Sequence, residues 1–427
     1  MKYKKNTIGR GSTVLQLVSA SAVNPSTFVL REVRELRRMG FQVVIGQLRP
    51  VSKPMSTNGF DELASLVIRP RWWSPTVLLG ILYYVVKQPR RLWQYLSLIF
   101  RGGAQLKSRA KMLYILLAAI SFAYRFRRHE SVHIRGHFLH TEALAACFVG
   151  GLLQAPYSIT VHTVVVHFPP NVVSEVVRKA SFVVADTVQV QEFLERLHVP
   201  REQIRLIRNG LPLDELKFQP DRQRTDPRIL LAAGYLVPKK GFDVLLSACS
   251  ILLERGVRFQ CVIVGDGAER GRLEGLIREL GLQRQVEMVG DVAFRELKEW
   301  YYRATVFIMP SVRLSDGATD GLPTVVLESL ACGTPVVGTT TAAIPEVILH
   351  GKTGLLVPPN APKAMADQIL TLLSQEGLRS SLALEGRQLI EKEFDLLRNS
   401  EALAQLILAP SSVPQAFAVK ELSAELS

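Results

Sequence analysis

The strongest constraint on the fold is a repeated alternation of short apolar runs with amphipathic helices. Residues 13–18 form an apolar run, residues 27–39 show helical hydrophobic spacing that stops at Gly40, and residues 41–45 resume as a strand. A strand, a helix and a second strand in this order form the unit from which parallel, doubly wound sheets are built. The chain is therefore predicted to be α/β, with a Rossmann-like N-terminal half.

A second series of the same kind begins after residues 204–207 and the turn at Asn209-Gly210. Residues 228–233 predict a strand, residues 243–255 a helix and residues 259–264 another strand. Shorter strands are expected at 131–134, 157–161 and 181–185 in the first half, and at 286–289, 306–309, 335–337 and 354–357 in the second. We therefore expect two Rossmann-like domains facing a cleft, with ligands beyond the carboxyl ends of the strands.

The domain boundaries follow from length and composition. A chain of 427 residues suits two domains, and residues 211–226, rich in Pro, Asp and Gln, resemble a linker. We place an N-terminal Rossmann-like domain at 1–213, a C-terminal Rossmann-like domain at 214–400, and a C-terminal helix and tail at 401–427. A basic, aromatic helical insertion at about 71–128 interrupts the first domain.

The charge balance predicts a polyanionic partner. The chain has 52 Lys and Arg against 38 Asp and Glu, a net charge of +14. Nucleic acid, anionic lipid and a diphosphate ligand all fit this charge, and charge alone does not choose among them. The four cysteines, Cys147, Cys249, Cys261 and Cys332, are scattered in apolar contexts without a Cys-x-x-Cys pair. They are expected to be buried free thiols in a reducing cytosol.

The insertion at 71–128 combines aromatic residues with cations. Its aromatic residues are Trp72, Trp73, Tyr83, Tyr84, Trp93, Tyr95 and Phe100, and its cations include Lys87, Arg90, Arg91, Lys107, Arg109 and Lys111. Its apolar stretches, 77–86 and 112–124, are shorter than the ~20 residues that a spanning helix needs. Such helices suit an anionic bilayer surface, although buried helices with snorkelling cations are the alternative. The basic N-terminus lacks the apolar core of a signal peptide. We therefore expect a cytoplasmic protein, peripheral on the inner face of the cytoplasmic membrane.

Residues 309–333 are the most informative segment for function. They run from a buried strand through a polar, glycine-bearing loop into a helix with Pro323 near its first turn and Gly333 past its end. The free N–H groups and positive dipole end of such a helix suit a diphosphate. Glu328 could accept hydrogen bonds from the paired hydroxyls of a ribose, and Asp320 could hold hydroxyls of a sugar.

These residues carry a family resemblance. Asp320-Gly-Leu-Pro-x4-Glu328, followed by residues 331–337 and 351–358, resembles the donor-site signature of retaining family 4 glycosyltransferases, which have the GT-B fold. Residues 234–241 are similar to the loop in which this family holds the donor diphosphate. In the N-terminal half, residues 25–32, 133–138 and 158–162 resemble members that build bacterial exopolysaccharide, the colanic-acid enzymes in particular.

The resemblance implies roles for individual residues. Glu328 would bind the donor ribose, and Lys240 would bind the diphosphate together with the backbone of Gly321, Leu322 and Thr324. Asp320 and His162 are the implied catalytic residues, and His162 would face the donor sugar near its anomeric carbon. No metal or other cofactor is expected, because these fixed charges would stabilise the leaving group.

The implied function is retaining transfer of a hexosyl-type sugar in cell-surface polysaccharide biosynthesis. The donor would be a UDP- or GDP-sugar, and the acceptor a membrane-associated, lipid-linked or other oligosaccharide; nucleic acid is not an expected partner. Two departures from the family pattern are Asp320 in place of the usual Glu and Tyr235 in place of the usual Arg. They leave open a catalytically weakened GT-B binding protein, and a nucleotide-sugar 2-epimerase-like isomerase is a further alternative.

Two other motifs are weaker. His133, His137 and His140 have a spacing that could suggest a metal site, but Gly136 and the strand-like flanks do not give the helical face that this spacing needs. Residues 265–267 lack the third glycine of a dinucleotide-binding loop. Neither motif is expected to bind its ligand.

Overall fold

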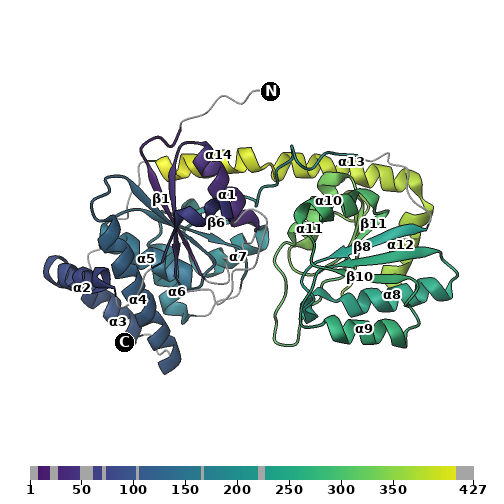
Figure 1. The fold of residues 1–427 in the computed structure, drawn as a ribbon, viewed down its shortest axis with the longest axis horizontal. Helices are drawn as coiled ribbons and strands as arrows, with labels where there is room; N and C mark the ends of the chain where they lie inside the picture. The colour runs from purple at the N-terminus through teal and green to yellow at the C-terminus, as the bar shows by residue number, and fades with distance from the viewer. Residues whose placement is uncertain are drawn as a thin grey trace, which may run out of the picture. The chain divides into compact units, whose positions relative to one another are not determined.

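The computed structural model describes residues 8–19, 27–48, 61–69, 74–101, 105–164, 168–219 and 227–409 (Figure 1). The chain divides into two compact units. The N-terminal unit runs to Asp186, resumes over Val190–Ile207 and includes the described residues from Ser400 onward. The C-terminal unit comprises Thr187–Gln189 and Arg208–Asn399. The chain thus leaves the first fold at Ile207 and returns to it near its end.

The N-terminal unit is built on a seven-stranded parallel sheet in the order β3-β2-β1-β4-β5-β6-β7. Its strands are β1 (Thr13–Val18), β2 (Gln42–Gln47), β3 (Val67–Ile68), β4 (Val132–His137), β5 (Tyr157–Val161), β6 (Phe182–Ala185) and β7 (Ile204–Leu206). Its helices are α1 (Thr27–Arg38), α2 (Pro75–Lys87), α3 (Pro89–Arg101), α4 (Leu106–Phe126), α5 (Thr141–Leu153), α6 (Pro170–Arg178) and α7 (Val188–Arg196). The strand order reverses between β1 and β4, which makes their carboxyl ends the expected ligand crevice of this sheet.

The C-terminal unit contains a six-stranded parallel sheet in the order β10-β9-β8-β11-β12-β13. Its strands are β8 (Arg228–Ala233), β9 (Phe259–Val264), β10 (Val286–Gly290), β11 (Val306–Met309), β12 (Val336–Thr339) and β13 (Leu355–Val357). Its helices are α8 (Phe242–Glu254), α9 (Arg270–Glu279), α10 (Phe294–Arg303), α11 (Thr324–Cys332), α12 (Pro362–Ser374) and α13 (Glu376–Glu393). Here the order reverses between β8 and β11, so a second crevice is expected at their carboxyl ends.

The predicted α/β architecture with two parallel sheets is confirmed. The expected bounds of β1, β5, β8, β9 and β11 match those observed. β4 is longer than expected, because the run at 131–134 continues through Arg135 to His137. Arg135 and His137 are buried, and polar side chains remain in a buried strand only where they have partners. Their partners come from other elements, which is why a hydrophobicity pattern ends the strand too early.

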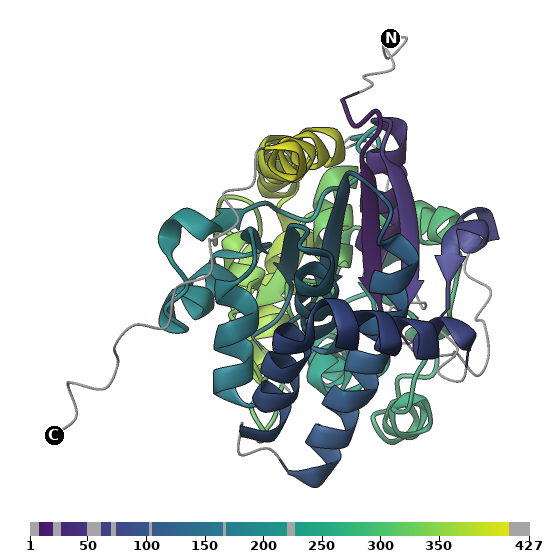
Figure 2. The same cartoon turned by 90° about the vertical axis from the view of Figure 1, so that its left-hand side faces the viewer.

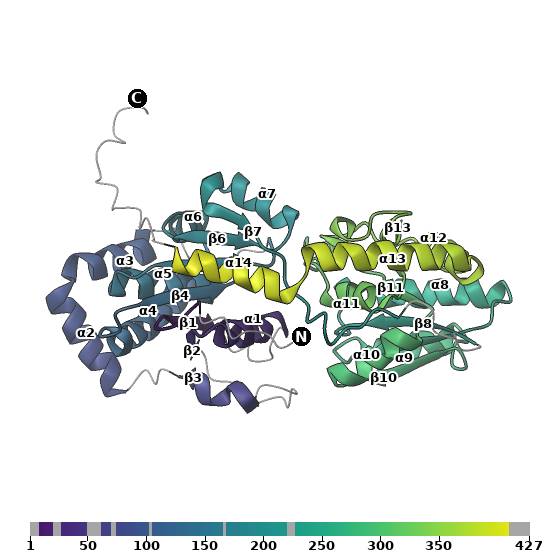
Figure 3. The same ribbon diagram turned by 90° about the horizontal axis from the view of Figure 1, so that it is seen from above.

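The C-terminal helix contributes to the N-terminal core. α14 (Leu396–Leu408) was expected as a separate helix and tail from residue 401 onward, and residues 410–427 of that segment lie outside the described residues. Leu403, Ala404 and Ile407 pack in one apolar cluster with residues of β1, α1 and β2. Figure 3 shows this part of α14, in yellow, lying beside the N-terminal sheet. The boundary predicted at 213–214 falls within the C-terminal unit, and residues 220–226 of the predicted linker are outside the described residues.

The basic, aromatic insertion folds as the three helices α2, α3 and α4, drawn in dark blue in front of the sheet in Figure 2. α4 is largely buried, and Tyr84 and Tyr95 are buried as well. Trp93 and Phe100 are exposed, while Arg71, Trp72 and Trp73 lie outside the described residues. Within the described ranges, no helix is both long enough and apolar enough to cross a bilayer.

The four cysteines are buried free thiols, as predicted. Burial raises the pKa of Cys147 to about 11 and that of Cys332 to about 12. Because the thiolate is the reactive form, such thiols are poor nucleophiles. These cysteines are therefore core residues.

Candidate active site

Loops that follow three strands of the C-terminal sheet meet at its reversal point. Gly234 follows β8 and Gly265 follows β9, and a Cβ atom on Gly265 would lie 2.0 Å from the carbonyl oxygen of Gly234. Gly241 has φ +66°, and a Cβ there would lie 2.1 Å from the carbonyl oxygen of Pro310, which follows β11. Only glycine allows backbones to approach this closely. The sequence motif at 234–241 therefore brings its lysines next to the loop that precedes α11.

Lys240 and Asp320 form an ion pair at this point, although the sequence suggested separate roles for them. Lys239 Nζ also lies 3.2 Å from Asp320 Oδ1 and 3.4 Å from the carbonyl oxygen of Thr319, to which it donates. Lys240 is buried, and its ammonium is directed across the loop by the 3-10 turn at Pro238–Lys240. The Asp320 carboxylate thus contacts the lysines that were expected to bind a diphosphate.

α11 begins at Thr324, with Pro323 in extended conformation at the N-cap and Gly333 in left-handed conformation after its end. These bounds are those expected from the sequence. Gly321 and Leu322 precede the helix and lie beside Asp320 in the chain. The first N–H groups of a helix have no partner within it and attract anions. The N-terminus of α11 and the lysines of 239–240 therefore offer positive charge to one site, since Asp320 joins the two loops.

Glu328 lies on α11 and is buried. The hydroxyl of Tyr301, which is buried on α10, donates a hydrogen bond of 3.0 Å to Glu328 Oε2. Tyr301 was not singled out from the sequence, because nothing within the chain links a helix tyrosine to a carboxylate 27 residues away. Its contact fixes the orientation of the carboxylate.

Tyr235, which stands where the family usually has Arg, is 59% exposed. Its backbone carbonyl accepts a hydrogen bond from the Val237 N–H, so the residue takes part in the loop that carries Lys239 and Lys240. In the described part of this loop, Lys239 and Lys240 are therefore the cations that contact Asp320.

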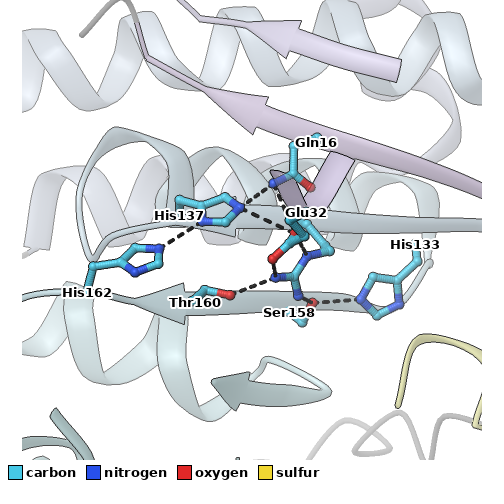
Figure 4. Close-up of polar contacts among 8 residues, drawn as sticks. Gln16, Glu32, His133, His137, Ser158, Thr160 and His162 are labelled. Atoms are coloured by element: carbon cyan, nitrogen blue, oxygen red, sulfur yellow. Dashed lines mark hydrogen bonds and ion pairs between the residues drawn. The ribbon is translucent and has the colours of Figure 1, made fainter. Parts of the chain in front are cut away.

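The N-terminal unit holds His162 in a buried polar cluster at its own reversal point (Figure 4). His162 follows β5; its Nδ1 lies 2.9 Å from Asp186 Oδ2, and its Nε2 lies 3.0 Å from His137 Nδ1. The ring of Phe28 lies 4.3 Å from the His162 ring and that of Phe138 lies 4.9 Å from it, centroid to centroid. Hydrogen bonds and ring contacts together fix the plane of this imidazole.

A second part of the cluster is the pairing of Glu32 with Arg135. Arg135 Nε donates to Glu32 Oε1 at 2.9 Å, and a terminal nitrogen of Arg135 donates to Glu32 Oε2 at 3.0 Å. The guanidinium also donates to the hydroxyls of Ser158 and Thr160, at 3.0 and 2.7 Å. His133 contacts the same Ser158 hydroxyl at 2.8 Å. Four of the five N–H groups of this fully buried arginine are thereby hydrogen-bonded to oxygen, which compensates the burial of its charge.

The cluster shifts the pKa values of its members. Burial alone would raise the pKa of Glu32, but Arg135 and His137 outweigh it and hold that pKa well below its usual range. Burial lowers the pKa of His137 to about 4, opposed by Glu32 and assisted by His162 and Arg135. Burial and Arg135 lower the pKa of His133 to about 3. Perturbed groups gathered at a sheet reversal point are typical of a functional site.

The three N-terminal segments on which the resemblance to exopolysaccharide enzymes rests thus come together. Residues 25–32 supply Phe28 and Glu32, residues 133–138 supply Arg135 and His137, and residues 158–162 supply His162. Residues 25 and 26 lie outside the described part. Gln16 and Asp186 were not predicted. They lie outside the quoted motifs, and no sequence signal indicates their contacts.

In the parts of the chain that the structure describes, no group of three or more His, Cys, Asp or Glu side chains is arranged to hold a metal ion. His133 and His137 are used in the polar cluster instead. Independence from metal stays a prediction, tested below.

Comparison with known proteins identifies relatives. The family described as "Glycosyl transferases group 1" matches residues 214–389. The putative colanic acid biosynthesis glycosyltransferase WcaL of Escherichia coli is 28% identical over 406 residues, 91% of this chain and 97% of that protein. The amylovoran biosynthesis glycosyltransferase AmsK of Erwinia amylovora is 30% identical over 217 residues, 51% of this chain and 53% of its own length.

Solved structures share the fold. HepE of Anabaena, solved in complex with UDP, superposes with a TM-score of 0.70 at 15% identity, covering 92% of this chain and 98% of that one. Sucrose-phosphate synthase of Thermosynechococcus elongatus has the same TM-score and the same coverage at 20% identity. These likenesses confirm the expected GT-B fold, and the sequence relatives confirm the resemblance to glycosyltransferases of bacterial exopolysaccharide biosynthesis. Residues 214–389 therefore match the glycosyl transferases group 1 family, the chain is homologous to glycosyltransferases of colanic acid and amylovoran biosynthesis, and its fold is that of GT-B structural neighbours.

Proposed function

We propose that this enzyme transfers a hexosyl group, with retention of anomeric configuration, from a UDP- or GDP-sugar to a lipid-linked acceptor during assembly of a cell-surface polysaccharide. The observation that carries the proposal is the anion site of the C-terminal unit. Lys239 and Lys240 meet Asp320 beside the N-terminus of α11, at the reversal point of the sheet. Such a site suits the diphosphate of a nucleotide sugar.

The donor would displace the internal carboxylate. Its diphosphate takes the place of Asp320 on Lys240 and accepts hydrogen bonds from the backbone N–H groups of Gly321, Leu322 and Thr324. Asp320, released from the lysines, then binds hydroxyls of the sugar, and Glu328 binds the ribose hydroxyls. The complex of the structural neighbour HepE with UDP supports a nucleotide ligand for this fold. His162 is the proposed group of the N-terminal unit beside the reacting sugar.

The chemical step needs no group beyond these. The bond between the anomeric carbon and the diphosphate oxygen breaks, and the acceptor hydroxyl oxygen forms the new bond on the same face of the sugar. The acceptor proton passes to the departing diphosphate oxygen, which keeps the charges balanced. Lys240 and the dipole of α11 stabilise the negative charge that develops on the leaving group.

The proposed acceptor location rests on the outer face of α2, which is aliphatic and exposed. Its exposed residues are Leu78, Leu79, Leu82, Val85 and Val86, with Leu82 at 64% and Val86 at 76% exposure. Figures 1 and 3 both show α2 on the outer side of the N-terminal unit. Contiguous exposed apolar residues on a helix are typical of a surface that contacts protein or membrane.

The exposed cations beside α2 favour an anionic bilayer, and not a second protein, as the partner of its aliphatic face. Lys87 and Arg90 are exposed at the junction of α2 and α3, and Lys107 is exposed at the start of α4. Arg91 and Lys111 serve the fold instead: Arg91 donates to the carbonyl oxygen of Gly151, and Lys111 Nζ lies 5.1 Å from the centroid of the Phe168 ring. Aliphatic side chains flanked by exposed cations match the interface of an acidic membrane. We therefore place the enzyme on the cytoplasmic face of the membrane, where a lipid-linked acceptor is presented.

Nucleotide release tests the proposal against its alternatives. The purified enzyme is incubated with UDP- and GDP-sugars, with and without a membrane lipid extract, and free nucleotide diphosphate is measured. Release that depends on the extract, with retention seen by NMR of the product, supports transfer. Isomerised donor without release identifies a 2-epimerase-like enzyme. Donor binding with neither outcome identifies a binding protein.

A further inference from the structure

A buried chain of polar side chains connects β1 to the end of β6 within the N-terminal unit. It runs from Gln16 to His137, then to His162 and Asp186 (Figure 4 shows the first three). Gln16 and these three partners are each at most 5% exposed. Buried polar groups destabilise a core unless each hydrogen bond has both a donor and an acceptor.

The donor and acceptor roles along this chain follow from its two ends. An ionised carboxylate only accepts, so His162 donates through Nδ1–H to Asp186. His162 Nε2 is then the acceptor, and His137 must donate to it through Nδ1–H. His137 Nε2 is in turn an acceptor, and it requires a donor from the other side. One proton on each imidazole satisfies this pattern.

Gln16 supplies that donor, because Glu32 orients its amide. Gln16 Nε2 lies 3.4 Å from Glu32 Oε1 and also contacts His137 Nε2. The amide NH2 group has two hydrogens, one for each of these acceptors. The reverse orientation would place the amide oxygen against the Glu32 carboxylate. Arg135 holds that carboxylate with two hydrogen bonds, which fixes the end of the chain.

We infer that Gln16 is a positioning residue that sets the tautomer of His137 and, through it, that of His162. Glu32 and Arg135 hold Gln16, and Asp186 closes the chain at the other end. His162 is thereby kept as the Nδ1–H tautomer with its ring plane fixed between Phe28 and Phe138. The low pKa of His137, about 4, agrees with a neutral ring in this position.

The consequence for catalysis rests on the proposed function of His162. An imidazole with both ring nitrogens engaged in fixed roles is a neutral, immobile surface beside the sugar. Glu32 is the charged group that contacts Gln16 and His137, Arg135 is paired to Glu32, and Asp186 is the charged end of the hydrogen-bonded series. Changing Gln16 leaves these charged side chains in place and removes only the amide contacts with Glu32 and His137.

Histidine NMR tests the assignment directly and without substrate. The protein has 8 histidines, so a histidine-selective ¹⁵N spectrum has few signals. The variants His137→Gln and His162→Gln assign the signals of these two rings. In the wild type both rings should show the Nδ1–H tautomer pattern at pH 7. In Gln16→Glu the introduced carboxylate accepts instead of donating, so the pair should bind an extra proton or switch to Nε2–H. Unchanged tautomers in this variant would overturn the inference.

A second variant separates positioning from folding. Gln16→Met keeps the side-chain volume and removes the donor, and Gln47→Met is its matched control. Gln47 is also a buried strand glutamine, but its Oε1 accepts a hydrogen bond of 2.7 Å from Arg69 Nε, and Gln47 is not a member of the series from Gln16 to Asp186. We expect Gln16→Met to release the His137 tautomer and to lower kcat at least roughly tenfold with little change in donor KM. Gln47→Met should retain both tautomers and activity.

The hydrogen-bond assignment and the positioning role of Gln16 can be contradicted separately. If the tautomers change as stated but kcat is the same in Gln16→Met and wild type, the positioning role is overturned while the hydrogen-bond assignment stands. If both rings are already cationic or Nε2–H in the wild type at pH 7, the assignment itself is wrong, whatever the enzyme transfers. Thermal unfolding shows whether each variant is folded before either result is read. Should Gln16→Met be unfolded, Gln16→Glu and Gln16→Asn supply the same comparison.

Discussion

Asp320 and Lys240 form an ion pair, and we expect this contact to compete with anion binding. Asp320→Asn removes the competing carboxylate from both lysines. We expect UDP or GDP to bind roughly tenfold more tightly, about 1.4 kcal/mol, because the ammonium groups are no longer neutralised. Sugar transfer should fall at the same time, since the sugar loses a charged partner.

Isothermal calorimetry with UDP and GDP measures the first effect, and nucleotide release measures the second. Asp316→Asn is the matched control, since Asp316 lies in the same loop, is exposed and accepts a hydrogen bond from the backbone N–H of Ala318. Weaker nucleotide binding in Asp320→Asn would show that the carboxylate assists the diphosphate site instead of competing with it.

Glu328 is expected to bind the donor through charge-assisted hydrogen bonds. Glu328→Gln should weaken donor binding by roughly 1.5–3 kcal/mol while the fold is retained. Tyr301→Phe removes only the hydroxyl that orients Oε2 and should have a smaller effect in the same direction. Calorimetry with the donor measures both, and equal donor affinity in wild type and Glu328→Gln would remove Glu328 from the site.

At the scale of elements, the contact of α1 with β4 depends on Glu32 and Arg135. Glu32→Gln leaves a buried guanidinium without its counter-charge, and we expect a loss of roughly 3–5 kcal/mol in the free energy of unfolding. Glu195→Gln, which alters an exposed ion pair with Arg201, should have little effect. Urea denaturation at pH 7 compares the two variants.

The same contact predicts how stability depends on pH. The pKa of Glu32 is lower in the folded protein than in the unfolded one, so its stabilisation is present at neutral pH and is lost as pH falls below the ordinary carboxyl range. The lowered pKa values of His137, about 4, and His133, about 3, act with the same sign, from about pH 6.5 downward. Acid should therefore destabilise the wild type more steeply than Glu32→Gln. Parallel pH profiles of the two proteins would contradict this.

α2 is predicted to insert its aliphatic face into an acidic membrane interface. Changing Leu78, Leu82 and Val86 together to Ser should abolish flotation with acidic liposomes, because α2 loses the exposed apolar area that contacts the membrane. Lys87, Arg90 and Lys107 changed to Gln should weaken flotation in proportion to the lost attraction, about 1 kcal/mol for each charge. Added salt should weaken the wild type in the same way.

Two controls keep this prediction specific. Neutral liposomes should bind less than acidic ones, and Leu384→Ser, an exposed leucine on α13, should not alter flotation. The contrary outcome is a wild type that does not bind liposomes at low salt and elutes as a dimer, with a triple Ser variant that elutes as a monomer. In that case α2 contacts a second copy of the chain. That outcome would overturn the membrane assignment.

For the whole molecule, metal dependence is the broadest test of the proposed chemistry. Lysines and a helix N-terminus supply the positive charge at the anion site, so sugar transfer should be retained in EDTA at the rate measured without chelator. Nucleotide release with and without EDTA measures this. Complete loss with EDTA and recovery with magnesium or manganese would show that the diphosphate needs a cation that the described residues do not hold.

The sequence by itself determined the α/β class, the two parallel sheets and most strand bounds of this protein. These follow from local patterns: β8 is apolar from Ile229 to Ala233, and helix limits such as Pro323 and Gly333 depend on backbone preferences of single residues. The candidate donor-site residues around Asp320 are also indicated locally, because loop, helix start and carboxylates lie within one short segment. The composition of 71–128 predicts aromatic, basic helices, but it does not predict which of their side chains are exposed.

Only the tertiary structure decided which distant residues meet. Glu32 and Arg135 are separated by 103 positions, and Gln16 and His137 by 121, so no local pattern connects them. They meet because the strand order reverses between β1 and β4, which brings the ends of strands far apart in sequence to one edge. Burial of Tyr84 beside the exposed aliphatic face of α2, and packing of α14 on β1, depend in the same way on which surfaces are covered. Hydrophobic pattern specifies elements, whereas burial and hydrogen-bond completion specify their partners.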